Sequence, residues 1–252
     1  MSAGILKNPA SAQPLRRFPR GLQVGGLVPF TATDYPGKLA AVVFVQGCPW
    51  RCGYCHNPHL QARDGDGAMA WSEVMRLLKR RIGLIDAVVF SGGEPTLDPA
   101  LPAAIADVRG LGYAVGLHTA CIYPDRLETV LPLLDWVGFD VKAPFDAYEK
   151  VTGARDSGHK ASACVDLILA SGVAHECRTT VDAALLAESE IMAIATDMAG
   201  RGVKSYALQL ARATATVGES ASTPGASRPS AATLRQLEAL FARFTLRQGD
   251  FD

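Results

Sequence analysis

Short segments with strand character, most of them apolar, recur along this chain and alternate with segments of helical periodicity. These segments lie at 40–46, 87–90, 113–117, 136–139, 176–181 and 205–210. The stretch at 42–45, Val-Val-Phe-Val, is continuous, as in a strand that is buried on both faces. Strands that alternate with helices form parallel sheets with helical crossovers. We therefore expect an α/β fold. Six such units are fewer than the eight of a closed barrel, which predicts a partial, open six-fold parallel βα barrel.

The sequence predicts one folded domain with a tail at each end. Residues 1–21 mix Pro, Ala and Ser with basic residues and are expected to form a flexible tail. Residues 22–210 hold the strand–helix units, and 211–230 form a low-complexity linker of Ala, Thr, Ser, Gly and Pro. We expect 231–252 to form a helix that packs on the barrel through an apolar stripe. That stripe consists of Leu234, Leu237, Phe241 and Phe244.

Several helix ends carry the usual sequence signals. Ser72 is expected to cap the helix that follows 63–67. Asp98 is the expected N-cap of the next helix, with Pro99 at its first position and Gly110 just past its end. A later helix, from about residue 162, is expected to end at Gly172.

Composition argues against several classes of function. The 25 basic and 25 acidic residues cancel, so we expect no partner among nucleic acids and no membrane association. No apolar run approaches the roughly 20 residues of a membrane span. Six cysteines, three of them clustered, predict reduced thiols that serve a metal in the cytoplasm. Cys121, Cys164 and Cys177 are too scattered for a second cluster and are expected to be small buried residues.

Three cysteines follow the first strand with the spacing Cys-x3-Cys-x2-Cys: Cys48, Cys52 and Cys55. A loop of this length can turn three thiolates toward one point, and soft thiolates select an iron–sulfur cluster, zinc or copper(I). A closed zinc site or an ordinary cubane cluster needs four protein ligands. Three cysteines on a [4Fe-4S] cluster would leave one iron open. The alternative is a zinc knuckle with His56 or His59 as its fourth ligand.

Polar residues follow or end the other predicted strands. In parallel α/β folds, functional sites lie at the carboxyl ends of the strands, so these side chains are expected to converge. They are Gly92, Gly93, Glu94, His118, Thr119, Asp140, Lys142, Arg178, Thr180 and Gln209. A zinc knuckle makes no demand on the other strands, so this convergence favours a cluster with a bound cofactor.

Five motifs together resemble one family. They are Asp-Tyr-Pro-Gly-Lys at 34–38, the cysteine loop with Tyr-Cys-His-Asn at 54–57, Ser-Gly-Gly-Glu-Pro at 91–95, Asp-Val-Lys at 140–142 and Arg-Thr-Thr-Val at 178–181. The combination resembles the radical S-adenosylmethionine (SAM) enzymes that activate glycyl radical enzymes. It is most similar to the anaerobic ribonucleoside-triphosphate reductase activating proteins, with pyruvate formate-lyase activating enzymes as relatives. The resemblance covers roughly residues 22–210.

The resemblance implies a mechanism as well as a fold. Cys48, Cys52 and Cys55 would ligate a [4Fe-4S] cluster whose open iron chelates the amino and carboxylate groups of SAM. An electron from a flavodoxin- or ferredoxin-type donor would pass through the cluster and cleave SAM to a 5′-deoxyadenosyl radical. That radical would abstract hydrogen from a glycine of a partner enzyme, expected to be anaerobic ribonucleoside-triphosphate reductase. The residues implied around SAM are Tyr54, His56, Gly93, Glu94, Asp140 and Lys142.

Two interpretations are open for most of these cofactor contacts. Glu94 could accept a hydrogen bond from the SAM ammonium, or it could stabilise a helix N-terminus. Asp140 and Lys142 share one face of a strand and could bind SAM or pair with each other. Arg178 could bind a carboxylate or pair with Glu176.

The glycine pair and the residues beside the third cysteine have simpler roles. Gly92 and Gly93 carry no side chain, so a ligand can approach their backbone closely. His56 could be a zinc ligand or could donate a hydrogen bond to a cluster sulfur. The backbone of Tyr54 is expected to lie near the adenine.

Two departures from the family leave the substrate open. Relatives often have Asp-Thr-Asn-Gly where this chain has His-Thr-Ala-Cys at 118–121, and the segment after 210 lacks the expected aromatic and proline pattern. Both lie where substrate contacts are expected. The alternatives are therefore a radical SAM enzyme that acts on a small molecule or another peptide, and a non-catalytic zinc-binding protein.

Overall fold

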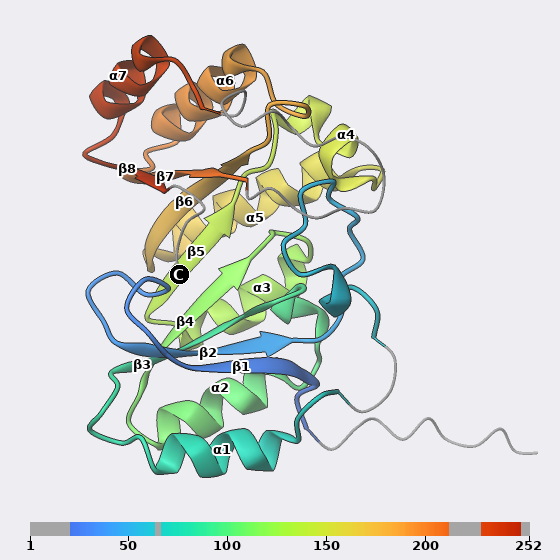
Figure 1. Ribbon diagram of the computed structural model, residues 1–252, viewed down its shortest axis with the longest axis vertical. Helices are drawn as coiled ribbons and strands as arrows, with labels where there is room; N and C mark the ends of the chain where they lie inside the picture. The colour runs from blue at the N-terminus through green and yellow to red at the C-terminus, as the bar shows by residue number, and fades with distance from the viewer. Residues whose placement is uncertain (1–20, 64–66, 212–227, 248–252) are drawn as a thin grey trace, which may run out of the picture.

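One eight-stranded sheet organises the molecule, as the computed structural model shows for residues 21–63, 67–211 and 228–247 (Figure 1). Its strands are β1 (Val24–Thr31), β2 (Ala40–Val45), β3 (Ala87–Gly92), β4 (Ala114–Thr119), β5 (Trp136–Asp140), β6 (Ala174–Val181), β7 (Ser205–Leu210) and β8 (Arg243–Arg247). Their order in the sheet is their order in the chain. β1 pairs antiparallel with β2, and every later pair is parallel.

Helices supply the crossovers between these strands. The α-helices are α1 (Trp71–Lys79), α2 (Leu101–Gly110), α3 (Pro124–Val130), α4 (Glu149–Thr152), α5 (Ser157–Ser171), α6 (Glu188–Gly200) and α7 (Ala231–Leu240). Short 3-10 turns are η1 (Pro58–Leu60), η2 (Pro95–Leu97), η3 (Leu131–Leu133) and η4 (Phe145–Ala147). β2 to β7 are the six predicted parallel strands. Within the described ranges β1 and β8 do not pair with each other, so the predicted open barrel is confirmed.

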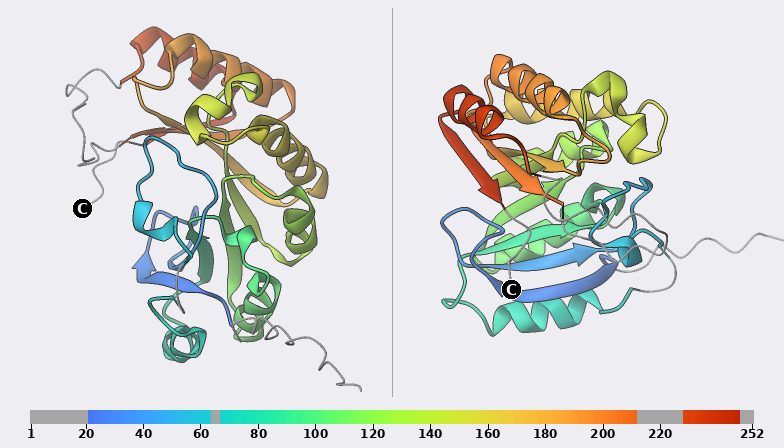
Figure 2. Two further views of the ribbon diagram at one scale, coloured as in Figure 1. Left: turned by 90° about the vertical axis from the view of Figure 1, so that its right-hand side faces the viewer. Right: turned by 45° about the horizontal axis from the view of Figure 1, so that its top comes forward.

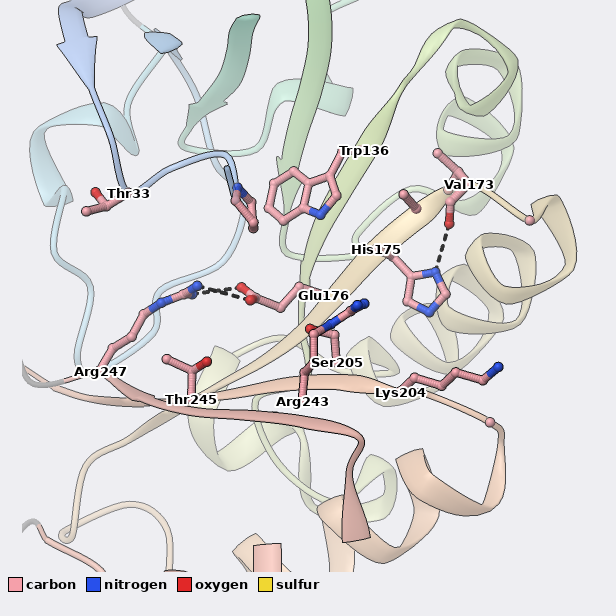
Figure 3. A pocket seen from close by; sticks show the side chains of 14 residues that line it. Thr33, Trp136, Val173, His175, Glu176, Lys204, Ser205, Arg243, Thr245 and Arg247 are labelled. Carbon is pink, nitrogen blue, oxygen red and sulfur yellow. Dashed lines mark hydrogen bonds and ion pairs between the residues drawn. The ribbon is translucent and has the colours of Figure 1, made fainter. Parts of the chain in front are cut away.

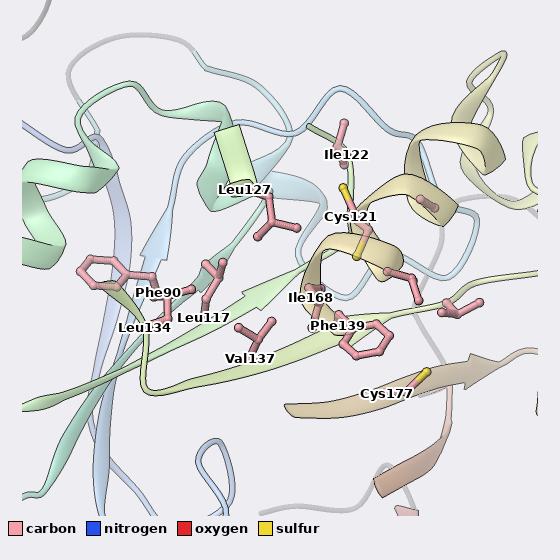
Figure 4. Packing of buried hydrophobic residues seen from close by; sticks show 14 of the residues in the cluster. Phe90, Leu117, Cys121, Ile122, Leu127, Leu134, Val137, Phe139, Ile168 and Cys177 are labelled. Atoms are coloured by element: carbon pink, nitrogen blue, oxygen red, sulfur yellow. The ribbon is translucent and has the colours of Figure 1, made fainter. Parts of the chain in front are cut away.

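The helices cover the outer face of the curved sheet, as two further views show (Figure 2). The main core lies between the helices and the sheet. Leu127 of α3 and Ile168 of α5 pack with Leu117 of β4 and with Val137 and Phe139 of β5 (Figure 4). Full burial of such side chains contributes roughly 1.5–3 kcal/mol each to the free energy of unfolding. Cys121, Cys164 and Cys177 are buried in the same cluster, as predicted.

A smaller cluster fills the inner face of the sheet. It contains Tyr35, Ala40, Val42, Ala87, Val89 and Trp136. Tyr35 reaches it from the turn between β1 and β2, and its ring lies 5.2 Å from that of Trp136. Of the Asp-Tyr-Pro-Gly-Lys motif, Tyr35 therefore packs inside the barrel.

The two edge strands were not predicted from the sequence. β1 contains Gly25, Gly26 and Pro29, which are poor strand formers, and Pro is tolerated because β1 is an edge. The single helix expected over 231–252 is wrong in extent, because α7 ends at Leu240 and Phe244 lies on β8. Phe244 still packs inward, with its ring 6.4 Å from that of Tyr206.

Helix starts also differ from the prediction. The N-cap of α1 is Ala70, and Ser72 lies in the first turn. α2 begins at Leu101 rather than Pro99, because the turn η2 precedes it. The Asp98 carboxylate accepts the backbone N–H of Ala100 and stabilises this junction. Gly110 is the last residue of α2 rather than the one beyond it. Gly172 ends α5 as expected, with a left-handed φ of 71°.

The predicted tail at 1–21 and linker at 211–230 fall almost entirely outside the described residues. Among the helices that the structure describes, none combines the length and apolar character required to cross a membrane.

Candidate functional site

A cavity of about 170 Å³ opens at the carboxyl ends of the strands, where sequence reasoning expected the site. Twelve of the residues predicted to converge there line it: Cys48, Cys52, Tyr54, Cys55, His56, Gly92, Gly93, His118, Thr119, Asp140, Lys142 and Thr180. Glu94, Arg178 and Gln209 do not line it. Residues from five separate segments therefore meet at one end of the barrel.

Backbone hydrogen bonds hold the cysteine loop in place. The N–H of Gly47 donates to the carbonyl of Leu60 over 2.7 Å, and that of Cys48 donates to Gln61 over 3.1 Å. The Gly47 carbonyl accepts the N–H of Glu94 over 2.9 Å. On its other side, the N–H of Arg51 donates to Thr152 over 2.9 Å. The loop is thus fixed at both ends before any ligand is considered.

The three cysteine thiols are half-buried and form no disulfide. Burial raises the pKa of Cys48 to about 11 and also raises that of Cys52. The Cys48 and Cys52 thiols therefore keep their protons at neutral pH until a metal displaces them. In the described residues, no three His, Cys, Asp or Glu side chains converge closely enough to hold a single metal ion.

Tyr54 lines the cavity and carries a buried, unsatisfied hydroxyl. Its side chain is 6% exposed, and its hydroxyl is the one buried side-chain donor or acceptor without a partner in the part of the chain described. The Lys142 ammonium lies 5.7 Å from the centre of its ring. A buried hydroxyl without a hydrogen bond costs roughly 1–3 kcal/mol.

The glycine pair brings β3 against the cysteine loop. A Cβ on Gly93 would lie 2.3 Å from the carbonyl oxygen of Gly47, and one on Gly92 would lie 2.4 Å from the backbone N of Val45. Gly92 also has a φ of +119°, which side chains rarely adopt. Both glycines are needed for close packing of the backbone, and their open edges line the cavity.

Glu94 is engaged by the protein rather than open to the cavity. Its carboxylate accepts the N–H and hydroxyl of Thr96, the hydroxyl of Thr119 and the N–H of Ala120. Burial raises the pKa of Glu94, and these hydrogen bonds oppose the shift. Its geometry matches the structural interpretation: it ties the loop after β3 to the end of β4, where Thr119 and Ala120 line the cavity.

Asp140 and Lys142 pair with each other and also face the cavity. Their carboxylate and ammonium are 2.8 Å apart. Burial lowers the pKa of Lys142, but attraction to Asp140, Tyr54 and Cys52, together with the hydrogen bond to Asp140, outweighs burial, so the pKa lies well above its ordinary value. The ammonium is therefore charged at neutral pH and lies beside the cysteine loop.

Tyr148 holds this pair in place and was missed by sequence reasoning. Its hydroxyl accepts the backbone N–H of Lys142 over 3.0 Å and donates to the carbonyl of Asp140 over 3.3 Å. Its ring makes an edge contact with Trp50 of the cysteine loop, with centroids 5.8 Å apart. The only available signal was an aromatic residue six positions after Lys142, which many surface turns also contain.

Arg178 lies deeper in the barrel, away from the cysteine cavity. Its Nε donates to Glu176 over 3.0 Å, as the structural interpretation predicted. The guanidinium lies 5.1 Å from the ring of Trp136. Nearby, His118 Nε2 donates to the carbonyl of Asp34 over 2.8 Å.

Comparison with known proteins identifies the family. The profile of the Radical SAM superfamily matches residues 42–190, more than half of the chain. A Methanocaldococcus jannaschii protein, named as a candidate glycyl-radical enzyme activating enzyme, is 34% identical over 68% of this chain and 73% of its own length. The pyruvate formate-lyase-activating enzyme of Clostridium pasteurianum is 34% identical over 50% of this chain. This chain spans about half the length of that enzyme, 55%.

Solved structures agree on the fold. The crystal structure of a radical SAM methyltransferase from Sphaerobacter thermophilus superimposes with a TM-score of 0.61 at 15% identity. The alignment covers 85% of this chain and 67% of that one. The strands, the cysteine loop and the matched profile thus coincide over one stretch of sequence, and the chain belongs to the Radical SAM superfamily.

Proposed function

We propose that this chain is a radical SAM activase of a glycyl radical enzyme, with a [4Fe-4S] cluster and SAM held in the cysteine cavity. One observation carries the proposal: three thiols, two glycine backbones and the Asp140–Lys142 pair line a single cavity at the carboxyl ends of the strands. Radical SAM enzymes use these two cofactors. The relatives named for glycyl radical activation support the reaction type.

The residues present fit these groups. Cys48, Cys52 and Cys55 supply soft thiolate ligands, and a four-iron cluster spaces its ligands more widely than one ion does. Tyr54, Gly92 and Gly93 line the same cavity as the three thiols, beside the space that a cofactor would occupy.

The protein's own contribution is orientation and electrostatics. Asp140 and Lys142 offer one charge of each sign, matched to the ammonium and carboxylate of SAM. Trp50, 3% exposed, and Tyr54 exclude water beside the thiols. When bound, the cluster and SAM supply a 5′-deoxyadenosyl radical, which takes a hydrogen atom from a glycine of the partner.

The partner we propose is anaerobic ribonucleoside-triphosphate reductase, with a flavodoxin- or ferredoxin-type protein as electron donor. This choice rests on the motifs at 34–38 and 91–95 and on the named activase relatives. The cytoplasm is the proposed location, because the six cysteines are free and reduced thiols persist there.

Anaerobic reconstitution with iron and sulfide tests the cofactors. Electron paramagnetic resonance of the reduced protein should show a [4Fe-4S] signal that changes when SAM is added, with 5′-deoxyadenosine formed. Cys52→Ala should abolish SAM cleavage and leave the far-UV circular dichroism unchanged. A colourless zinc protein, or cleavage by Cys52→Ala near the parent rate, would overturn the assignment.

Incubation with the purified reductase tests the partner. One stable glycyl radical per reductase chain, seen as a doublet by paramagnetic resonance, is expected. Repeated turnover of a small molecule without a protein radical would instead identify a radical SAM enzyme of another substrate class.

A further inference from the structure

A wider cavity lies at the opposite end of the barrel and has no part in the proposed reaction. Its volume is about 660 Å³, within the range of small-molecule sites. The first residues of the parallel strands line it, whereas the last residues of the strands line the cysteine cavity. Trp136, Ala174, Ser205 and Arg243 begin β5, β6, β7 and β8 (Figure 3). Thr33 and Pro36, from the turn after β1, complete the wall.

β8 turns a row of polar side chains into this cavity. Arg243, Thr245 and Arg247 line it, while the alternate residues Phe244 and Leu246 pack against the main core. This is the two-residue alternation of a strand. It accounts for the basic wall that Figure 3 shows along β8.

Lys204 lies next to Arg243. The backbone N–H of Arg243 donates to the carbonyl of Lys204 over 3.0 Å, and Arg243 pairs in register with Ser205. Both cationic side chains are exposed and belong to the cavity wall.

The charge of this wall is not balanced. Its one carboxylate, Glu176, already binds two cations: Arg178 over 3.0 Å, and Arg247 over 2.8 Å and 3.0 Å. Lys204 and Arg243 have no ion pair among the residues that the structure describes. The wall therefore carries net positive charge beside an open cavity.

Hydrogen-bond donors complete the lining. Trp136 presents its indole ring to the cavity, and Ser205 and Thr245 contribute hydroxyls (Figure 3). Arginine and lysine beside such donors suit oxyanions, since a guanidinium donates two parallel hydrogen bonds to a carboxylate or phosphate.

We propose that this cavity binds a small molecule bearing a carboxylate or phosphate group, with Lys204 and Arg243 as its counter-ions. The site is separate from the cysteine loop. It does not depend on the activase function proposed above.

Calorimetric titration of the full chain, purified without cluster, tests this site directly. Inorganic phosphate and malonate are the probes, in a buffer free of other oxyanions. Saturable binding of one molecule per chain is expected for at least one probe. The tighter of the two distinguishes a phosphate from a carboxylate ligand.

Charge-neutral variants locate the binding. Lys204→Gln combined with Arg243→Gln should weaken binding about tenfold or more, because two charge-assisted contacts are lost. Lys79→Gln combined with Arg80→Gln, which removes two exposed charges at α1, is the matched control and should bind as the parent does. If the double variant unfolds, Lys204→Gln alone, at an exposed position outside the strands, replaces it in the comparison with the parent protein.

Two results would overturn the proposal. One is the absence of saturable binding for both probes. The other is equal weakening in the two double variants, which would show only a general charge effect. Cys48→Ala should bind the probes unchanged, so failure of this site and failure of the activase assignment are distinguishable.

Discussion

Glu94 and Asp140 are carboxylates at the same end of the barrel, yet the protein uses them differently. Glu94 is fully buried and its oxygens are occupied by donors from Thr96, Thr119 and Ala120. Asp140 has a side chain that is 31% exposed, with one partner, Lys142, and it faces the cavity. Only Asp140 therefore has capacity left for a ligand.

Replacing Asp140 should separate SAM binding from cluster binding. Asp140→Asn removes the charge but keeps the shape, so SAM affinity should fall about tenfold, the value of one charge-assisted hydrogen bond. Iron content should stay at the parent level, because no cysteine is altered. Equilibrium binding of SAM and iron analysis measure the two. Asp146→Asn, at an exposed position on η4, is the control. Equal loss of SAM and iron would make Asp140 a structural residue.

His118 should make stability depend on pH. Burial lowers the pKa of His118 well below its ordinary value, and the charge of Arg178 acts in the same direction. Below about pH 6.5 the unfolded chain then binds a proton that the folded chain excludes. The stability contributed by neutral His118 is therefore complete above that pH and falls by up to about 1.4 kcal/mol per pH unit as the pH decreases.

Urea unfolding of the cluster-free protein between pH 5 and 8, a range of about three units around the usual histidine pKa, measures this slope. His118→Asn should flatten it, whereas the exposed His159→Asn should leave it unchanged. An identical slope in parent and His118→Asn would show that other groups carry the pH dependence.

At the scale of elements, the position of the cysteine loop depends on its close backbone contact with the end of β3. Gly93→Ala would bring a methyl group within 2.3 Å of the Gly47 carbonyl, so one of the two segments must move. Overpacking of this kind typically costs about 1–3 kcal/mol. Because Gly47 precedes Cys48, the variant should also retain less iron after reconstitution.

A matched glycine provides the control for this experiment. Gly110→Ala, at the end of α2, meets nothing within 4 Å and should be neutral or stabilise by up to about 1 kcal/mol. Urea unfolding and iron analysis of both variants give the comparison. Equal stability of Gly93→Ala and Gly110→Ala would contradict the close approach.

Sequence patterns predicted the elements whose signals are local. β2 is a continuous apolar run, most of β3 is apolar, and β7 has the predicted bounds, Ser205–Leu210. The sequence patterns did not predict β1 and β8, because these segments form strands through pairing with their neighbours rather than through a strand-like sequence. Gly25, Gly26 and Pro29 weaken the sequence signal for β1. The five residues of β8 closely follow α7, so Phe244 was read as part of the apolar stripe of the helix predicted over 231–252.

The part of the site that could be predicted from the sequence is the part that follows from the positions of the strand ends. The cysteine loop, Gly92, Gly93, Asp140 and Lys142 converge because parallel strands bring their carboxyl ends together. Side-chain partners were not predictable. The bonds of Glu94 to Thr119 and of Tyr148 to Lys142 depend on the packing of loops, for which sequence carries no periodic signal.

At the scale of the whole molecule, the last strand of the open barrel, β8, is stabilised by an ion pair as well as by packing. Glu176 of β6 binds Arg178 of the same strand and Arg247 of β8, skipping β7 between them. The side chains of Glu176 and Arg178 are only 7% and 8% exposed. One buried cation, Arg178, and one partly exposed cation, Arg247, thus share one carboxylate, and this group links β6 to the far edge of the sheet.

Glu176→Gln should therefore destabilise the whole fold. It leaves Arg178 and Arg247 without a counter-ion, and breaking a buried pair in this way typically costs about 3–5 kcal/mol. Arg247→Gln should cost less, because Glu176 then keeps Arg178 as its partner. Urea unfolding gives the stabilities, with the exposed Glu149→Gln as control.

Hydrogen exchange at Arg243–Arg247 should accelerate in Glu176→Gln more than exchange in β2, because β8 loses its only ion pair among the described residues. Uniform exchange, or a loss below about 1 kcal/mol, would show that packing of Phe244 and Leu246 alone holds the edge.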